Sequence, residues 1–212
     1  MSKLPITLAM FSKNNEKSIE LAIQSIIDVV NEFVLVDTGS TDSTIDIAKK
    51  YNARVYQIGF TDFGNIRTIT AHLASEPWIL GLDTDEIINR NELPILSLLL
   101  HNDEIDAWGL PRRRWADLNM TQQIEKEAYP DYQYRLIRNK KYLVYKNRVH
   151  ERLDGARKTE VAPFPHIEHF QDVFKTGDKL KARNKFYQEL YSLDIQDGIQ
   201  HSIPPISDID NK

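Results

Sequence analysis

The first 90 residues alternate between short apolar runs and segments in which apolar residues repeat with a helical period. This alternation constrains the fold more than any other feature. Apolar residues recur at three- and four-residue steps from Ile19 to Val30, and we expect further helices over 43–50 and 65–74. The flanking runs are typical of strands buried on both faces: ITLAMF (6–11), FVLVD (33–37), ARVYQI (53–58) and WILGLD (78–83). Such strands alternating with helices predict an α/β fold with a mainly parallel central sheet.

Polar residues follow three of these strands, directly where each strand ends. The groups are Ser12–Asn15, Asp37–Asp42 and Asp83–Glu86. In an open parallel sheet the ligand crevice lies beyond the carboxyl ends of the strands. We therefore expect the three groups to line one site.

The second group, DTGSTD, holds more polar residues than a turn requires. Gly39 gives the backbone conformational freedom. Ser40 or Thr41 is expected to cap the following helix, and Asp42 adds a favourable charge at the helix start. Asp37 has none of these structural tasks, so we expect it to contact a ligand.

The third group places Asp83, Asp85 and Glu86 at the end of an apolar strand. Because Asp83 and Asp85 are two residues apart, an extended backbone would project both side chains to the same side. Such oxygen ligands suit Mg²⁺ or Mn²⁺, usually together with substrate phosphates. The alternative is a solvated helix N-terminus, where acidic residues complement the helix dipole. The polar ends of the two other strands favour the metal site.

Beyond residue 90 the pattern changes, and a smaller mixed α+β part is expected. The sequence predicts a helix over NELPILSLLL, a strand over 106–115, a hairpin over 132–151 that turns near Asn139–Lys141, and a polar helix over about 177–192. The packing residues expected on the last helix are Leu180, Phe186, Leu190 and Leu193. The tail 200–212 has two consecutive prolines and no periodicity, which is typical of a linker or a disordered end and would suit a longer native chain with further C-terminal domains.

Composition excludes several classes of protein. The formal charge is −4, from 27 Lys and Arg against 31 Asp and Glu, which argues against a general nucleic-acid binder. The absence of cysteine excludes disulfides and thiolate metal sites. The N-terminus does not resemble a signal peptide, and no apolar stretch approaches the roughly 20 residues of a membrane span. We expect a cytoplasmic protein without a membrane span.

Seven segments together resemble the inverting GT-A glycosyltransferases of family 2, particularly small bacterial and viral members. In chain order they are MFSKNNE (10–16), VDTGSTDST (36–44), IRTITAHL (66–73), WILGLDTDE (78–86), YQYRLIRN (132–139), VHERL (149–153) and IEHF (167–170). The D-x-D alone is weak evidence, but DTGSTD followed by DTDE and VHE at these distances is a specific combination. The segments cover most of the chain.

The resemblance implies a Rossmann-like, three-layer GT-A domain over 1–199. Residues 1–88 would form the nucleotide-sugar half, 89–199 the acceptor-side half, and 200–212 the tail. The implied reaction is the metal-dependent transfer of a sugar from a nucleoside-diphosphate sugar, with UDP-glucose or UDP-rhamnose as examples, to a hydroxyl of a glycan acceptor. The implied cofactor is Mn²⁺ or Mg²⁺. For a viral member the compartment would be the host cytoplasm.

The resemblance also implies roles for single residues. Asp37 would receive the base or the ribose of the nucleotide. Phe11, Ser12 and Asn14 would line the same pocket, and Arg67 would face the diphosphate. Thr68 departs from the family, which often has Asn there.

The same resemblance places two residues on the metal and two more nearby. Asp85 would bind the divalent cation, and His169 would complete the metal shell or touch the diphosphate, although a lone histidine is more often structural. Asp83 would contact the ribose side of the nucleotide. Arg135 is a further site candidate because it lies inside the matching YQYRLIRN.

A carboxylate near the acceptor hydroxyl would act as the catalytic base. We favour Glu151 in RVHERL, with Asp131 as second choice. The alternative for Glu151 is a surface ion pair with Arg148 or Arg152. His150 is either structural or orients the neighbouring carboxylate or the acceptor.

The basic end of the strand over 106–115 also allows two interpretations. Arg112–Arg114 and Trp115 could contact phosphate and sugar, or they could form a solvated strand end, which is at least as good an interpretation for two of the three arginines.

Three rival functions are open from the sequence. A nucleotidyltransferase would share the nucleotide-binding half, although FSKNNE lacks the Gly-rich loop typical of that class. A haloacid-dehalogenase-type phosphatase would leave DTGSTD and VHE unexplained. The non-enzymatic alternative is a catalytically inactive module that binds a nucleotide sugar or a glycan.

Overall fold

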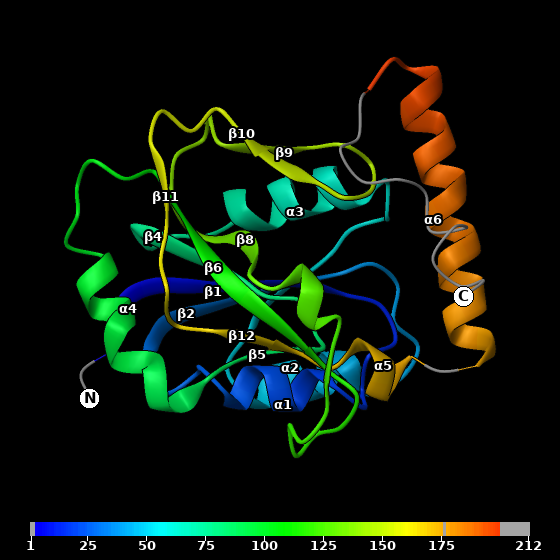
Figure 1. Cartoon of the computed structure of the whole chain (residues 1–212), viewed down its shortest axis with the longest axis horizontal. Coiled ribbons are helices and arrows are strands. Elements are labelled where there is room, and N and C mark those ends of the chain that lie inside the picture. Colours follow the sequence, from blue (N-terminus) through cyan, green and yellow to red (C-terminus); the bar gives the residue numbers. More distant parts are fainter. Residues whose placement is uncertain (1–2, 176, 200–212) are drawn as a thin grey trace.

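The expected parallel strands form one side of the central sheet in the computed structural model, which describes residues 3–175 and 177–199 (Figure 1). Their bounds are β1 Leu4–Ser12, β2 Val30–Asp37, β3 Arg54–Gln57 and β4 Trp78–Gly81. They lie in the order β3-β2-β1-β4, and each neighbouring pair is parallel. The α/β prediction is confirmed, because the apolar runs are buried between two layers of helices.

Strands from later in the chain extend this sheet beyond β4 and make it mixed. The order continues β4-β8-β6-β12-β5, with β7 and β11 paired to β6. The bounds are β5 Glu86–Ile88, β6 Ala107–Trp115, β7 Gln123–Ile124, β8 Asp131–Arg138, β11 Thr159–Val161 and β12 Ile167–His169. Strand β8 is antiparallel to both β4 and β6, whereas β12 is parallel to β6. Parallel pairing therefore dominates only the first half of the sheet.

Helices cover both faces of the sheet (Figure 1). Helices α1 (Ile19–Gln24), α2 (Thr44–Lys50) and α4 (Leu93–Leu99) contribute to the larger core, together with the alternating β1 side chains Ile6, Leu8 and Met10. Helix α3 (Phe63–His72) packs on the other face, where Ala9 of β1 faces a second, smaller core. This period-two division of β1 produces the three layers, and each buried Ile or Leu stabilises the fold by roughly 1.5–3 kcal/mol.

The prediction of a hairpin over 132–151 is wrong. Strand β8 ends at Arg138, and β9 (Val144–Lys146) pairs instead with β10 (Arg152–Asp154) in a separate two-stranded sheet. Leu136 and Ile137 of β8 are both buried although adjacent residues point to opposite faces. Strand β8 pairs with β4 along one edge and with β6 along the other, which leaves no edge for β9.

The polar helix expected near the end of the chain is α6 (Asp178–Gln196), and α5 (Gln171–Phe174) precedes it. Leu190 is buried as expected, but Phe186 and Leu193 are 38% and 45% exposed. Helix α6 lies beside the start of α3 (Figure 1). It contacts that region through aromatic rings, with the ring of Phe63 5.0 Å from that of Tyr187. Aromatic contacts and the ion pair between Arg148 and the buried Asp194, rather than a leucine stripe, hold the helix.

Short 3-10 turns at Arg90–Glu92 and Lys126–Ala128 complete the elements. The tail 200–212, interpreted above as a linker, lies outside the described residues. Within 3–175 and 177–199, every helix is too short or too polar to cross a membrane.

Candidate active site

The structure brings the first two polar groups together at the carboxyl ends of β1 and β2. Ser12 and Asp37 are direct partners in the parallel register, and the Thr38 N–H donates to the Ser12 carbonyl over 2.8 Å. Asn14 joins the two loops, because its N–H donates to Ser40 Oγ over 2.9 Å and its Oδ1 accepts from the Thr41 N–H over 2.8 Å. We call residues 12–15 and 37–42 the loop pair.

Asp37 is completely buried at the base of the loop pair. Its Oδ2 accepts from the N–H groups of Gly39 and Ser40 over 3.0 and 2.9 Å, and Gly39 adopts a φ of 105°. Its Oδ1 is also buried but has no hydrogen-bond partner among the described residues. Asp37 thus shapes the turn, contrary to the expectation that it had no structural task, and still presents a free acceptor. A buried acceptor without a donor costs about 1–3 kcal/mol, which a ligand N–H or O–H would offset.

The prediction that Ser40 or Thr41 caps α2 is wrong. Asp42, not Ser40 or Thr41, holds the start of the helix, since its Oδ1 accepts from the N–H and the hydroxyl of Thr44 over 3.0 and 2.6 Å. Ser40 and Thr41 are engaged with Asn14 instead. The fold uses them to connect the loops, and the carboxylate next to the helix takes their place.

Phe11 and Ser12 support the site from β1. The guanidinium of Arg67 lies 4.9 Å from the centre of the Phe11 ring, and Ser12 Oγ accepts from Asn15 Nδ2 over 3.0 Å. Ser12 is buried, whereas Asn14 is exposed at the rim. These residues lie where the sequence placed them.

The acidic group after β4 lies in a turn, so the expected extended backbone with Asp83 and Asp85 on one side is wrong. The Glu86 N–H donates to the Asp83 carbonyl over 3.1 Å, and the Asp83 N–H donates to Glu86 Oε2 over 3.0 Å. Strand β5 follows directly, which also removes the alternative of a helix N-terminus. The turn points its two aspartates at different partners.

Asp83 is at the centre of a chain of alternating charges. Arg67 Nη2 lies 2.7 Å from Asp83 Oδ1 and 2.6 Å from Glu151 Oε1. Arg135 Nη2 lies 2.9 Å from Asp83 Oδ2 and 3.3 Å from Glu86 Oε1. Glu151 therefore does not form the surface pair with Arg148 or Arg152 that the sequence left open.

Arg112 extends the chain to the other candidate base. Its Nη1 lies 3.2 Å from Glu86 Oε1, and its Nη2 lies 2.6 Å from Asp131 Oδ2. We call the seven residues the ion network: Glu151, Arg67, Asp83, Arg135, Glu86, Arg112 and Asp131. The two candidate bases stand at its two ends. Glu151 is the more enclosed, with 17% of its side chain exposed against 38% for Asp131.

The arginines keep Glu151 and Asp83 ionised. Burial raises the pKa of Glu151, but the charges of Arg67 and Arg135 outweigh burial and hold that pKa below its ordinary value. Burial likewise raises the pKa of Asp83, and the same two arginines bring it well below the ordinary value. An ionised Glu151 is in the protonation state that a general base requires.

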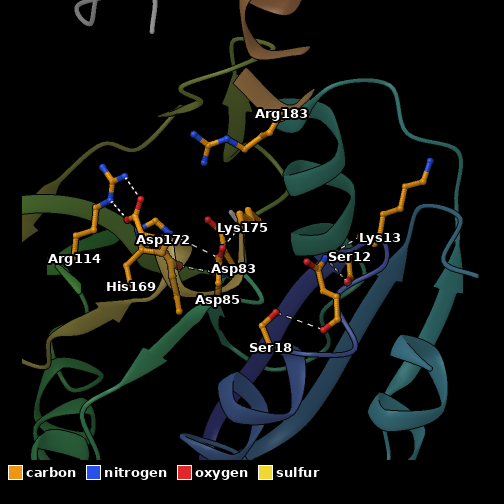
Figure 2. Close-up of polar contacts among 12 residues, drawn as sticks. Ser12, Lys13, Ser18, Asp83, Asp85, Arg114, His169, Asp172, Lys175 and Arg183 are labelled. Atoms are coloured by element: carbon orange, nitrogen blue, oxygen red, sulfur yellow. Dashed lines mark hydrogen bonds and ion pairs between the residues drawn. The ribbon is translucent and has the colours of Figure 1, made fainter. Parts of the chain in front are cut away.

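Asp85 and His169 form a second, adjacent cluster (Figure 2). His169 Nε2 lies 3.7 Å from Asp85 Oδ1, and Lys175 Nζ lies 2.6 Å from Asp85 Oδ2. The Phe170 N–H donates to the Asp85 carbonyl over 2.9 Å, which fixes the turn to the end of β12. Burial raises the pKa of Asp85, but the hydrogen bond from His169 and the charge of Lys175 lower it below the ordinary value.

The donor atoms of this cluster fit a divalent cation only in part. One carboxylate and one imidazole suit Mn²⁺ or Mg²⁺, which commonly fill their other positions with water and substrate phosphate oxygens. Among the described residues, no group of three or more His, Cys, Asp or Glu side chains could hold a metal ion. A cation here would therefore take its other ligands from water or from substrate phosphates.

The arginines of β6 are not a solvated strand end. Arg112 belongs to the ion network, Arg113 pairs with the fully buried Glu168, and Arg114 Nε lies 2.6 Å from Asp172 Oδ2. Sequence reasoning left Arg112 open between a phosphate contact and a solvated strand end, and it missed Lys175 as a site residue. The period of two along β6 could have shown that Arg112 and Arg114 share a face, but nothing near Lys175 in the sequence indicated its partner.

His150 lies against α6 rather than between the carboxylates. Its φ is 53°, and its ring stands edge-on to the rings of Tyr187 and Tyr191 at 6.3 and 6.5 Å. This packing supports the structural interpretation of His150.

Comparison with known proteins identifies the family of the chain. Residues 7–157 match the family model described as Glycosyl transferase family 2. An uncharacterized glycosyltransferase of Rickettsia felis is 24% identical over 144 residues, covering 68% of this chain and 51% of that protein. The lipopolysaccharide core biosynthesis glycosyltransferase LpsC of Rhizobium meliloti is 29% identical over 117 residues, covering 52% of this chain and 43% of that protein. The chain thus spans about half the length of these relatives.

A solved structure shares the fold. Residues 1–349 of S. aureus TarS, in complex with UDP-GlcNAc, superpose with a TM-score of 0.62 over 97% of this chain and 68% of that chain, at 17% identity. This similarity confirms the expected GT-A-like α/β architecture.

Proposed function

The chain belongs to glycosyl transferase family 2, and on this premise we propose that it moves a sugar from a UDP-sugar to a hydroxyl of a glycan acceptor with the help of a divalent cation. The observation that carries the proposal is that three parts gather near the carboxyl ends of the neighbouring strands β2, β1 and β4, where Arg67 contacts Phe11 of β1 and pairs with Glu151 and Asp83. The three parts are a buried free acceptor on Asp37, an ionised Glu151 held by Arg67, and the Asp85–His169 pair. Each part matches one need of glycosyl transfer.

Asp37 supplies the nucleotide contact. Its free Oδ1 would accept a hydrogen bond from the base or from a ribose hydroxyl, and the loop pair around it would enclose that end of the donor. Uracil offers a ring N–H to such an acceptor. The UDP-GlcNAc bound to TarS supports a UDP-linked donor in a site of this fold.

The charges around Asp83 and Asp85 favour metal assistance. Five carboxylates (Asp83, Asp85, Glu86, Asp131 and Glu151) contact four cations (Arg67, Arg112, Arg135 and Lys175), which gives a formal charge of −1. A diphosphate would add further negative charge to groups that are already paired. Asp85 and His169 would hold Mn²⁺ or Mg²⁺, which when bound supplies electrostatic stabilisation of the leaving diphosphate.

Glu151 would take the proton of the acceptor hydroxyl. The freed oxygen forms its bond to the anomeric carbon while the bond to the diphosphate breaks, the electron pair leaves with UDP, and a single displacement inverts the anomeric configuration. Arg67 orients Glu151 through a 2.7 Å hydrogen bond from Nε and keeps it ionised. Asp131 is the second candidate, at the opposite end of the ion network.

A panel of UDP-sugars with Mn²⁺ tests the proposal. Release of UDP from at least one sugar nucleotide, its loss in EDTA and its loss in the Asp85→Asn variant are the expected results. Asp103→Asn, which removes an exposed Arg138 pair of 2.8 Å, is the matched control and should retain activity. Binding of UDP without turnover of any donor would support the inactive binding module, and release of pyrophosphate from UTP would support a nucleotidyltransferase.

A further inference from the structure

Lys175 occupies the carboxylate that the proposed metal would bind. Its Nζ lies 2.6 Å from Oδ2 of Asp85, whose side chain is only 2% exposed. His169 Nε2 stands near the other oxygen at 3.7 Å. In this position the Lys175 ammonium donates a charge-assisted hydrogen bond to the buried carboxylate of Asp85. The structure therefore shows a monovalent cation where a divalent one would bind (Figure 2).

The backbone of Lys175 is fixed, but its side chain can move. Lys175 lies directly after α5, and its N–H donates to the Gln171 carbonyl over 2.8 Å. Its side chain is 31% exposed, and a lysine has a flexible four-carbon stem. The ammonium can thus leave Asp85 by side-chain rotation, without unfolding the neighbouring elements.

A buried carboxylate requires a counter-charge at all times, because an unpaired buried charge is strongly destabilising. A divalent cation bound to Asp85 beside His169 would repel the Lys175 ammonium across the same carboxylate and weaken its contact with Oδ2. We propose that Lys175 is an exchangeable counter-ion: it neutralises Asp85 in the metal-free protein, gives up this carboxylate when a divalent cation binds, and then pairs with the diphosphate of the donor. This inference rests on the proposed function, in that it takes Asp85 as a metal ligand.

The diphosphate is the natural second partner for the released ammonium. Arg67, Arg112 and Arg135 are each held by two carboxylates, so they are poorly placed to serve another anion. Lys175 alone among these four cations would lose its carboxylate on metal binding. The Lys175 ammonium would then lie next to the bound divalent cation and could pair with the diphosphate of the donor when the donor binds.

Two calorimetric titrations test the exchange, and the Lys175→Met variant is expected to bind Mn²⁺ more tightly in the first and UDP more weakly in the second. In the nucleotide-free protein, Lys175→Met should bind Mn²⁺ about tenfold more tightly than the wild type, because no ammonium has to be displaced. In saturating Mn²⁺, the same variant should bind UDP about tenfold more weakly, because the diphosphate has lost a cation. Lys158→Met is the matched control. Its ammonium also lies 2.6 Å from a carboxylate, that of Glu104, but the pair is exposed and has no place in the site.

A charge-conserving variant guards against loss of folding. Lys175→Arg should fold with wild-type stability in EDTA and keep the weaker Mn²⁺ binding. For Lys175→Met, thermal unfolding in EDTA should show a lower Tm that added Mn²⁺ restores, since the metal replaces the missing counter-charge.

The outcomes separate this inference from the proposed function. Equal Mn²⁺ affinity of wild type and Lys175→Met would overturn the exchange while leaving sugar transfer intact. Tighter Mn²⁺ binding with unchanged UDP binding would overturn the diphosphate step. If neither protein binds Mn²⁺, the exchange is wrong, and the donor panel above decides independently whether the chain is a transferase.

Discussion

In the loop pair, Asp37 keeps a buried oxygen without a partner among the described residues, whereas in the ion network each arginine is bound to two carboxylates. The loop pair is held by hydrogen bonds from backbone N–H groups to side-chain oxygens and presents one preformed acceptor. The ion network has its charges matched internally. The difference indicates two modes of binding: the loop pair gains a hydrogen bond directly, while the charged region accepts an anion only with an added cation or an exchange of partners.

The largest effect is expected at the end of the ion network. Glu151→Gln keeps the shape of the side chain but removes its basicity, so transfer should fall by about 10²–10⁴-fold. UDP affinity should remain unchanged by calorimetry. Asp131→Asn is the matched variant at the opposite end and should reduce turnover far less. Near-normal turnover of Glu151→Gln with a large loss in Asp131→Asn would assign the base to Asp131.

Asp37→Asn tests the preformed acceptor in the loop pair. The amide oxygen can still accept from Gly39 and Ser40, but an NH₂ group replaces the free Oδ1. UDP affinity should fall about 10–100-fold, because the new NH₂ group would face the N–H or O–H donor of the nucleotide. The Tm of the ligand-free protein should change little, because the substitution exchanges one buried unpaired acceptor for a buried unpaired NH₂ donor. A lower Tm with unchanged UDP affinity would show that Asp37 serves only the turn.

Asp83→Asn, in contrast to Asp37→Asn, should mainly lower the stability of the ligand-free protein. It weakens charge-assisted hydrogen bonds to both Arg67 and Arg135, so the free energy of unfolding should fall by about 2 kcal/mol in urea titrations. Asp103→Asn, on an exposed arginine pair, should change it by less than about 0.5 kcal/mol. Equal losses in the two variants would mean that the ion network is no more important for stability than a surface pair.

The pH dependence of this loss follows from the direction of the Asp83 pKa. The folded pKa lies well below the ordinary value of 3.8, so the contribution of Asp83 to stability is present above pH 3.8 and is lost as the pH falls through the folded value. The stability difference between wild type and Asp83→Asn should therefore be constant above about pH 5 and shrink below pH 3.8. A difference that grows on acidification would contradict the assignment.

The smallest effect is expected at the helix start beside the loop pair. Asp42→Ala removes the cap on Thr44 and should lower the free energy of unfolding by about 1 kcal/mol, measured by urea unfolding. Ser40→Ala removes the hydrogen bond from the Asn14 N–H at the exposed rim and should cost less. A larger loss of stability in Ser40→Ala than in Asp42→Ala would support Ser40 as the cap of α2, as predicted from the sequence.

Local patterns predicted the first half of the fold well. Runs such as ITLAMF and WILGLD are buried on both faces in a parallel sheet, so their position and their polar ends could be inferred from neighbouring residues alone. The cap of α2 was misjudged because Ser40, Thr41 and Asp42 are all good caps. Only the contact with Asn14, more than 25 residues away along the chain, decides among them.

Residue patterns alone predicted only the acidic members of the charged region, and the family resemblance added Arg67 and Arg135. A cluster such as DTDE is visible in the sequence, but its partners depend on strand pairing. Lys175 meets Asp85 across 90 residues, and Arg112 reaches Asp131 because β6 and β8 pair in a register that the hydrophobic pattern alone did not fix. The hairpin error at 132–151 had the same origin, since adjacency in sequence was taken for adjacency in the sheet.

The strand order also sets when the site can exist. Residues 82–85 directly join β4 to β5, yet β8, β6 and β12 lie between these two strands in the sheet, and all three come from later in the chain. On a ribosome the acidic turn emerges well before Arg135, His169 and Lys175. Its carboxylates stay hydrated until these distant partners arrive, at the entropic cost of closing long loops. Assembly of the charged region is therefore expected to be a late event in folding, after the parallel strands have formed.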